Sequence, residues 1–286
     1  MQGTVDGFNY GLVTPLVAYL MACLGGALGL RCTARSLTAS RSRRAAWLAL
    51  GSAAIGSGIW TMHFIAMMGF TIEGTPIRYD VPTTFASLAV AVVMVGIGTF
   101  IVGYRGAAGT ALFTGGTITG LGIASMHYLG MASMHLDGAL EYDTLLVAAS
   151  VVIAMAAATA ALWAAGQVKG LRWSVGAALV MGLAVTGMHY TGMAALEVHV
   201  HGGTAPATGE SAATLLGPML IGPLAFLVLL GLLVVFDPLV ITGRPAPVRE
   251  RRPGIPAHPD LHHSPARPRP RARGPVEHRH RTPQKR

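Results

Sequence analysis

The sequence predicts an all-helical polytopic membrane protein that crosses the bilayer seven times. Of its 286 residues, 52% are hydrophobic and only 12% are charged, and the mean hydropathy is +0.53. A soluble domain carries about 25% charged residues. The apolar residues form seven runs of about 20 residues, the length that a helix needs to cross the hydrocarbon core. A motif that recurs at regular intervals further predicts that six of these helices form three similar pairs.

The predicted spans alternate with short polar loops and leave a tail at the C-terminal end. The first eleven residues contain no Lys or Arg, so they lack the basic region of a cleavable signal peptide, and the first run is predicted to stay as a span. The membrane domain is predicted to cover 8–243 and the tail 244–286. The spans are predicted at 12–30, 45–68, 83–102, 110–131, 144–165, 174–196 and 215–235.

Basic residues predict how the chain is oriented. The loops after the first, third and fifth spans contain eight of the nine Lys and Arg residues that precede the tail, and the loops on the other side contain only Arg78. Cytoplasmic loops are the ones enriched in Lys and Arg. The protein is therefore predicted to lie in the inner or plasma membrane of the cell. Its N-terminus is predicted to lie outside the cell and its C-terminus in the cytoplasm. The same topology predicts that the second, fourth and sixth spans run outward in parallel.

The tail, 244–286, contains the whole net charge of +9, with twelve basic and three acidic residues. It is rich in Pro, Arg and His and has almost no large apolar side chains, so it is predicted to be disordered. Its arginines are expected to lie near anionic lipid headgroups. It has no aromatic residue for base stacking and no nucleic-acid-binding signature, so no nucleic-acid partner is expected.

One motif occurs three times, near the end of each outward span: Met-His, an aromatic residue, and a second Met four places after the His. The histidines are 64 and 62 residues apart. Because residues i and i+4 share one helix face, each His and its second Met point the same way. If the three helices face a common axis, three imidazoles and three thioethers converge near the outer surface. The histidines are His63, His127 and His189, and the second methionines are Met67, Met131 and Met193.

Imidazole and thioether together form a soft ligand set that suits copper, whereas Mg²⁺, Ca²⁺ and Mn²⁺ prefer oxygen ligands. Zinc accepts three imidazoles but has no need of the methionines. We therefore expect a copper site formed by the three histidines and the three second methionines. The methionines that precede each His, namely Met62, Met126 and Met188, lie about 100° round the helix from it and could face a neighbouring helix instead.

Structural explanations of the same residues stay open. A span histidine can simply hydrogen-bond across helices, and methionines often fill irregular gaps in a core. Phe64, Tyr128 and Tyr190 fit the interfacial aromatic belt. The small residues before each second Met permit close helix approach; they are Ala66, Gly130 and Gly192.

Further histidines lie in the outer loops. His135 follows the fourth span, and His199 and His201 would point to one side of an extended backbone. These two could supply metal to the buried site, or they could belong to a solvated loop.

The motif resembles that of the MHYT-domain integral membrane proteins of bacteria. Met-His-Tyr-Thr stands at 188–191, Met-His-Tyr-Leu at 126–129 and Met-His-Phe-Ile at 62–65. The resemblance covers about 8–240. It implies a membrane sensor domain in which copper is bound by the three histidines and the three second methionines, with Met62, Met126 and Met188 as secondary ligands. The bound copper would detect oxygen, carbon monoxide or nitric oxide. Many members carry a cytoplasmic output domain, and the short tail here suggests that a separate cytoplasmic signalling protein receives the signal.

Two other functions stay open beside a sensor without enzymatic activity. One is a metal transporter or metal-handling protein, since transporters also contain internal repeats. The other is a haem protein, because His and Met ligate haem iron. The sequence has no nucleophile–base pair, P-loop or Rossmann motif that would indicate a hydrolase or a nucleotide-dependent enzyme.

Overall fold

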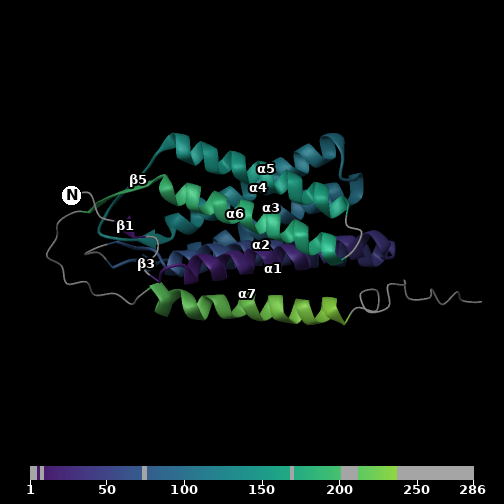
Figure 1. The fold of residues 1–286 in the computed structure, drawn as a ribbon, viewed down its shortest axis with the longest axis horizontal. Helices are drawn as coiled ribbons and strands as arrows, with labels where there is room; N and C mark the ends of the chain where they lie inside the picture. The colour runs from purple at the N-terminus through teal and green to yellow at the C-terminus, as the bar shows by residue number, and fades with distance from the viewer. Residues whose placement is uncertain (1–4, 7–9, 73–75, 168–170, 201–211, 237–286) are drawn as a thin grey trace, which may run out of the picture. The chain divides into compact units, whose positions relative to one another are not determined.

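The computed structural model describes residues 5–6, 10–72, 76–167, 171–200 and 212–236. These residues form long helices joined by short strands (Figure 1). The helices are α1 Val13–Thr38, α2 Arg41–Met68, α3 Val81–Arg105, α4 Gly109–Ala132, α5 Thr144–Gly166, α6 Leu171–Ala194 and α7 Ala212–Val235. The strands are β1 Val5–Asp6, β2 Thr71–Ile72, β3 Arg78–Tyr79, β4 Met134–His135, β5 Gly138–Tyr142 and β6 Leu196–Val200.

The first six helices form a closed ring. Each packs against the next along the chain, and α6 packs against α1. α7 lies outside this ring and packs on α1 and α2. Its contact is a buried cluster in which Leu227 and Leu230 of α7 meet Leu28 of α1 and Ala54 of α2. The predicted second, fourth and sixth spans thus alternate with the others around the ring.

The strands, which the sequence did not predict, lie together at one end of the bundle (Figure 1). Three antiparallel pairs form: β1 with β2, β3 with β4, and β5 with β6. Each pair joins the strand before an odd-numbered helix to the strand after the next even-numbered one. The chain therefore repeats the order strand, helix, helix, strand three times. Inward-facing residues of these strands, including Ile72, Met134 and Val198, belong to the main buried core.

Six helices are long and apolar enough to cross a membrane, judged by length and composition. α4 is not among them, although a span was predicted there. It is rich in Gly and Thr, which lower its mean hydropathy, and it packs between α3 and α5. The all-helical prediction is correct for the membrane part, apart from the short strands at one end.

The predicted basic loop after the first span is almost entirely helical, which corrects the sequence interpretation. α1 continues past residue 30 to Thr38, and α2 begins at Arg41. Arginine favours helix nearly as well as leucine, so a helix can continue beyond the apolar run. Arg44 donates to the carbonyl of Gly103 and lies 5.1 Å from the ring centroid of Tyr104, which ties α2 to the end of α3.

Glycines allow α1 and α2 to approach closely. A Cβ at Gly58 would lie 2.6 Å from the Cα of Gly25, and one at Gly25 would lie 2.7 Å from the carbonyl oxygen of Ala54. Membrane helices associate through such close packing, because lipid provides no hydrophobic drive between them. The predicted tail, 244–286, lies outside the described residues.

Substituting Gly58 by Ala should separate α1 from α2. Because backbone atoms surround the new methyl group, we expect a loss of about 1–3 kcal/mol in the free energy of unfolding. Thermal unfolding of the purified protein measures it. Gly176→Ala in α6 is the control: no atom lies within 4 Å of its new Cβ, so its stability should be unchanged or slightly higher. Equal loss in both variants would contradict the proposed contact.

Asp80 caps the start of α3, and its carboxylate accepts a hydrogen bond of 2.8 Å from the backbone N–H of Thr83. This hydrogen bonding lowers the pKa of Asp80. The ionised cap therefore stabilises the fold above the ordinary aspartate pKa, and that contribution disappears as the pH falls through the lowered pKa. Asp80→Asn still caps but does not titrate. Between pH 6 and pH 3, the melting temperature of the wild type should thus fall more than that of Asp80→Asn.

Candidate metal centre

The three motif histidines occupy equivalent places in α2, α4 and α6. Each lies five residues before the last residue of its helix: His63 before Met68, His127 before Ala132, and His189 before Ala194. The helices that bear them alternate around the ring. The shared distance from the helix end and the ring closure together bring the three side chains to one point.

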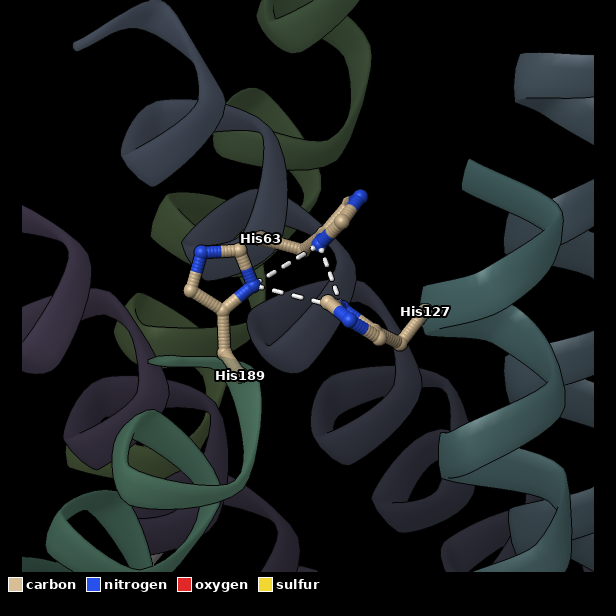
Figure 2. Close-up of side chains that lie close together, drawn as sticks. All are labelled: His63, His127 and His189. Atoms are coloured by element: carbon tan, nitrogen blue, oxygen red, sulfur yellow. Dashed lines mark hydrogen bonds between the residues drawn. The ribbon is translucent and has the colours of Figure 1, made fainter. Parts of the chain in front are cut away.

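The rings meet through the same atom (Figure 2). The Nδ1 atom of His63 lies 3.1 Å from that of His127 and 3.1 Å from that of His189, and the remaining Nδ1 pair is 3.3 Å apart. Their planes are nearly perpendicular, with interplanar angles of 80–88°. All three residues are at most 1% exposed. Three ring nitrogens are therefore enclosed together in the protein interior.

Three mutually close Nδ1 atoms cannot all be satisfied by hydrogen bonds with one another. In a neutral imidazole, Nδ1 either carries a proton and donates or carries a lone pair and accepts. Among three such atoms, at least two must be of the same kind. One of the three contacts then sets lone pair against lone pair, or N–H against N–H. A cation bound by three lone pairs removes this conflict, because all three nitrogens then act in the same way.

The opposite side of two rings faces glycine. The Nε2 atoms of His63 and His127 are buried, and neither has a hydrogen-bond partner in the described part of the chain. A Cβ at Gly130 would lie 2.5 Å from Nε2 of His63, and one at Gly192 would lie 2.5 Å from Nε2 of His127. Each ring is thus backed by the glycine of the next motif along the chain. Any bulkier residue there would push the imidazole away.

Aromatic neighbours hold the rings from the side. His63 meets Phe64 edge-on at 4.7 Å, and His127 meets Tyr128 at 4.9 Å. In the first repeat, the indole N–H of Trp60 donates to the hydroxyl of Ser87 at 2.9 Å, which anchors α2 to α3. In the second repeat, the hydroxyls of Tyr128 and Ser150 lie 2.7 Å apart, which anchors α4 to α5. The predicted aromatic belt is therefore at least partly internal: Phe64 is fully buried.

A metal ion fits this arrangement by distance and by chemistry. Metal–nitrogen bonds of about 2.0–2.1 Å at tetrahedral angles place donor nitrogens about 3.3 Å apart. The separations of 3.1–3.3 Å agree. If Nδ1 binds a metal, Nε2 keeps the proton, and it then points at a glycine instead of the carboxylate or carbonyl that usually orients a metal-binding histidine. Steric packing supplies the orientation here.

The motif methionines belong to the main buried core or pack against it. Met62, Met126 and Met188 are at most 1% exposed, and so are Met67 and Met131, whereas Met193 is partly buried. This burial agrees with packing as well as with ligation. Their role as ligands stays a prediction.

The outer histidines lie apart from the triad. His135 is exposed on β4, and its Nδ1 lies 3.1 Å from the carbonyl oxygen of Ser133. His199 on β6 lies 3.6 Å from the carboxylate of Glu141 on β5. With Glu197 these two residues form a second group of ligand atoms, within 4.8 Å of one another but largely exposed. His201 lies outside the described residues, so the predicted His199–His201 pair cannot be placed together.

Comparison with known sequences agrees with the repeat. A profile of the MHYT repeat, described as a bacterial signalling protein N-terminal repeat, matches residues 56–115 and 120–178. The chain belongs to the MHYT family. The first match contains His63 and the second His127, and His189 follows outside both. Together with the apolar helices, this membership identifies a multi-pass membrane protein with a signalling domain.

Several relatives are bacterial signalling proteins. The bifunctional diguanylate cyclase/cyclic di-GMP phosphodiesterase MucR of Pseudomonas aeruginosa is 38% identical over 66% of this chain and 28% of its own length. The cyclic di-GMP phosphodiesterase NbdA of that organism is 35% identical over 71% and 27%. The signaling protein YkoW of Bacillus subtilis is 29% identical over 67% and 24%. The chain thus spans about a quarter of their length. No solved structure matches.

The sequence interpretation missed what the small motif residues do. It assigned Gly130 and Gly192 to helix packing in general, whereas the structure places them against imidazoles. Their position three residues after each His is visible in the sequence. The partner of each glycine is not, because it belongs to the preceding motif more than 60 residues away.

Gly130→Ala should displace the imidazole of His63 from the triad. The ring must move because the new Cβ would lie 2.5 Å from Nε2. In protein labelled with ¹⁵N-histidine, the imidazole nitrogen signals of His63 should shift, and those of the other two rings should respond. Gly187→Ala, two residues before His189 with no atom within 4 Å of its new Cβ, should leave them unchanged. Unshifted signals in Gly130→Ala would show that the glycine does not position the ring.

Proposed function

We propose that this chain is a membrane-embedded sensor module that binds copper through its three motif histidines. The observation that carries the proposal is the buried triangle of Nδ1 atoms, 3.1–3.3 Å apart, which hydrogen bonds alone cannot satisfy. Neutral imidazoles are the form that binds metal. The family membership supports a signalling role for the same region.

Copper is the metal that the surroundings favour. Among the described residues, the triad contains no carboxylate: its three donors are all imidazole nitrogens. Hard cations prefer oxygen donors, so this set disfavours magnesium, calcium and manganese. The neighbouring motif methionines would add thioethers, which select Cu(I). When bound, copper would supply a redox-active centre able to respond to a diatomic gas or to redox state.

The histidines themselves would do three things. Their Nδ1 lone pairs would hold the ion, and their separate helices would fix its position between α2, α4 and α6. The core that surrounds them would keep bulk water away, since Met62, Phe64 and Met126 are all 0% exposed. Because the donor atom is the ring nitrogen nearer the backbone, a change in the metal–nitrogen distance would act directly on the three helices.

The ring of helices and the charge of the loops support a proposed membrane placement. We propose seven spans, including α4, because α4 lies within the ring between helices that can span the bilayer. The strand–helix–helix–strand order supports a threefold two-helix repeat. The positive-inside rule then puts the strand end, and the histidines near it, at the outer face. The C-terminal end of α7 would face the cytoplasm.

Two alternatives remain as competing proposals. A haem group would have to separate three nitrogens that lie 3.1–3.3 Å apart. Side chains also close the site where the macrocycle would need space. For a metal transporter, the triad would be a station on a pathway through the bilayer. The cavity on the inner side of the triad is mostly aliphatic, which favours a sensor over a cation pathway.

The signalling partner is a proposal by analogy. Two relatives are named for cyclic di-GMP activity, and this chain spans only about a quarter of their length. We propose that the module passes its signal to a cytoplasmic signalling protein or domain. α7 is the helix through which the membrane part continues toward the C-terminus.

Replacing the three triad histidines by alanine should abolish copper binding. Purified wild-type protein reconstituted with Cu(I) should retain copper in a fixed ratio to protein, measured by elemental analysis after desalting. The triple variant should retain none, and each single variant should bind it much more weakly because two imidazoles remain. His135→Ala, which removes an exposed histidine outside the triad, should match wild type. Unchanged copper in the triple variant would refute the proposed site.

The role of the methionines can be tested separately. Leucine keeps most of the volume of methionine but has no sulfur. In the variant with Met67, Met131 and Met193 all changed to Leu, X-ray absorption of the copper-loaded protein should lose its sulfur scattering and keep its nitrogen scattering. Met155→Leu, on α5 outside the motifs, should keep both. Spectra that do not change on triple substitution would assign these methionines to packing alone.

A further inference from the structure

The faces of α2, α4 and α6 that bear the histidines also line a cavity, toward the N-terminal ends of these helices. One turn before each His stands a β-branched residue, Ile59, Ile123 or Val185. Two turns before stand the residues Ile55, Thr119 and Met181. All six line one cavity between the helices. Since residues i, i+4 and i+8 share a helix face, the cavity lies on the same axis as the triad, separated from it by one layer of aliphatic side chains.

Two threonine hydroxyls in the cavity wall lack partners. Thr99 of α3 is 1% exposed and Thr119 of α4 is 4% exposed, and both line the cavity. Neither Oγ1 atom has a hydrogen-bond partner in the described part of the chain. A third lining residue, Thr33 of α1, donates to the carbonyl of Gly29 at 2.9 Å and keeps lone pairs free to accept.

Of the described helical threonines, Thr14, Thr61 and Thr186 also lack a hydrogen-bond partner, but they do not line the cavity. Three others bond within their own helices. Thr33, Thr159 and Thr191 each donate to the backbone carbonyl four residues earlier, as hydroxyls in membrane helices commonly do. Thr99 and Thr119 do not. A buried hydroxyl without a partner destabilises the fold, and two of them border the same cavity. A molecule that bonds to both would remove that cost.

We propose that this axial cavity binds a small uncharged molecule, which forms hydrogen bonds with the hydroxyls of Thr99 and Thr119. Water has the size and the chemistry that the site requires. The cavity has room for about one water molecule, which needs two to four polar partners to stay buried. Thr99, Thr119 and the lone pairs of Thr33 provide them. The remaining lining is mainly aliphatic, including Ala157, Ala158 and Ala161 of α5, and contains no charged side chain, so an ion would lose its hydration without compensation.

This binding site does not depend on the metal. Its lining residues on α2, α4 and α6 lie one and two turns before the histidines, and its chemistry requires only the hydroxyls of Thr99 and Thr119. It does share a wall with the triad, since Ile59, Ile123 and Val185 separate the two. Occupancy of the cavity would therefore support the aliphatic layer on which the imidazoles rest.

Radiolytic hydroxyl footprinting of the full chain in lipid nanodiscs tests the proposal, because it labels side chains next to bound water even inside a membrane protein. In the wild type we expect labelling of Met181, which lines the cavity and is only 7% exposed. In the double variant Thr99→Val, Thr119→Val, which preserves shape and removes both hydroxyls, this labelling should be lost. Thr159→Val is the control, since its hydroxyl is already bonded within α5 and does not line the cavity.

A high-resolution structure of each protein gives the second measurement. Density within hydrogen-bond distance of both hydroxyls is expected in the wild type and not in the double variant. If the wild type shows neither labelling of Met181 nor density, the cavity is dry and the proposal is wrong. Density that persists in the double variant would also overturn it, because the occupant would then be apolar. Copper content plays no part in either result, so the two proposals fail separately.

Discussion

Everything in this fold that is unusual depends on three imidazoles sharing one point. Two histidines can share a proton between them and satisfy each other. A third histidine at the same distance makes full pairing impossible, since each ring nitrogen either donates or accepts. The fold keeps the Nδ1 atoms 3.1–3.3 Å apart despite this. Helix packing must supply the stability that the contact itself lacks.

The repeat supplies this packing with small, specific differences between its copies. Gly130 and Gly192 give the rings of His63 and His127 the space they need. The equivalent residue in the first motif is Ala66, which carries a Cβ, and the pair of rings that excludes His63 has the longer Nδ1 separation of 3.3 Å. The triad is therefore close to threefold but not threefold. A mixture of two glycines and one alanine gives a site in which one ligand can differ from the others.

The first repeat also differs in what covers it. α7 packs on α1 and α2 and not around the ring as a whole. Its contacts involve Leu227 and Leu230 on one side and Ala54 of α2 on the other. In α2, 83% of an apolar stretch of 18 residues is buried. Of the three helices that bear the histidines, α2 is thus the one bound to the C-terminal helix.

Sequence reasoning could find the site because its signals are periodic. The spacing of His63, His127 and His189 and the charge of alternate loops place the rings at one level, and the structure brings them together. The helix ends and strands were harder. Val5–Asp6 and Thr71–Ile72 are too short to show a strand period, and they form only because the ring brings their partners near. α1 extends eight residues beyond the predicted end at residue 30. Arginine is a good helix former, so a helix can continue beyond the apolar run.

The glycines behind the rings also limit how the site can change. With Gly130 and Gly192 in contact with the imidazoles, a ring cannot retreat when the separation of the Nδ1 atoms changes. We then expect the helices to move instead, because each ring rests against the backbone of a neighbouring helix. Movement of α2 would be passed to α7 through their shared cluster, and movement of any of the three helices would be passed inward to Ile59, Ile123 and Val185. A buried site that cannot adjust locally is suited to signalling, because any change within it has to appear in the packing of the helices.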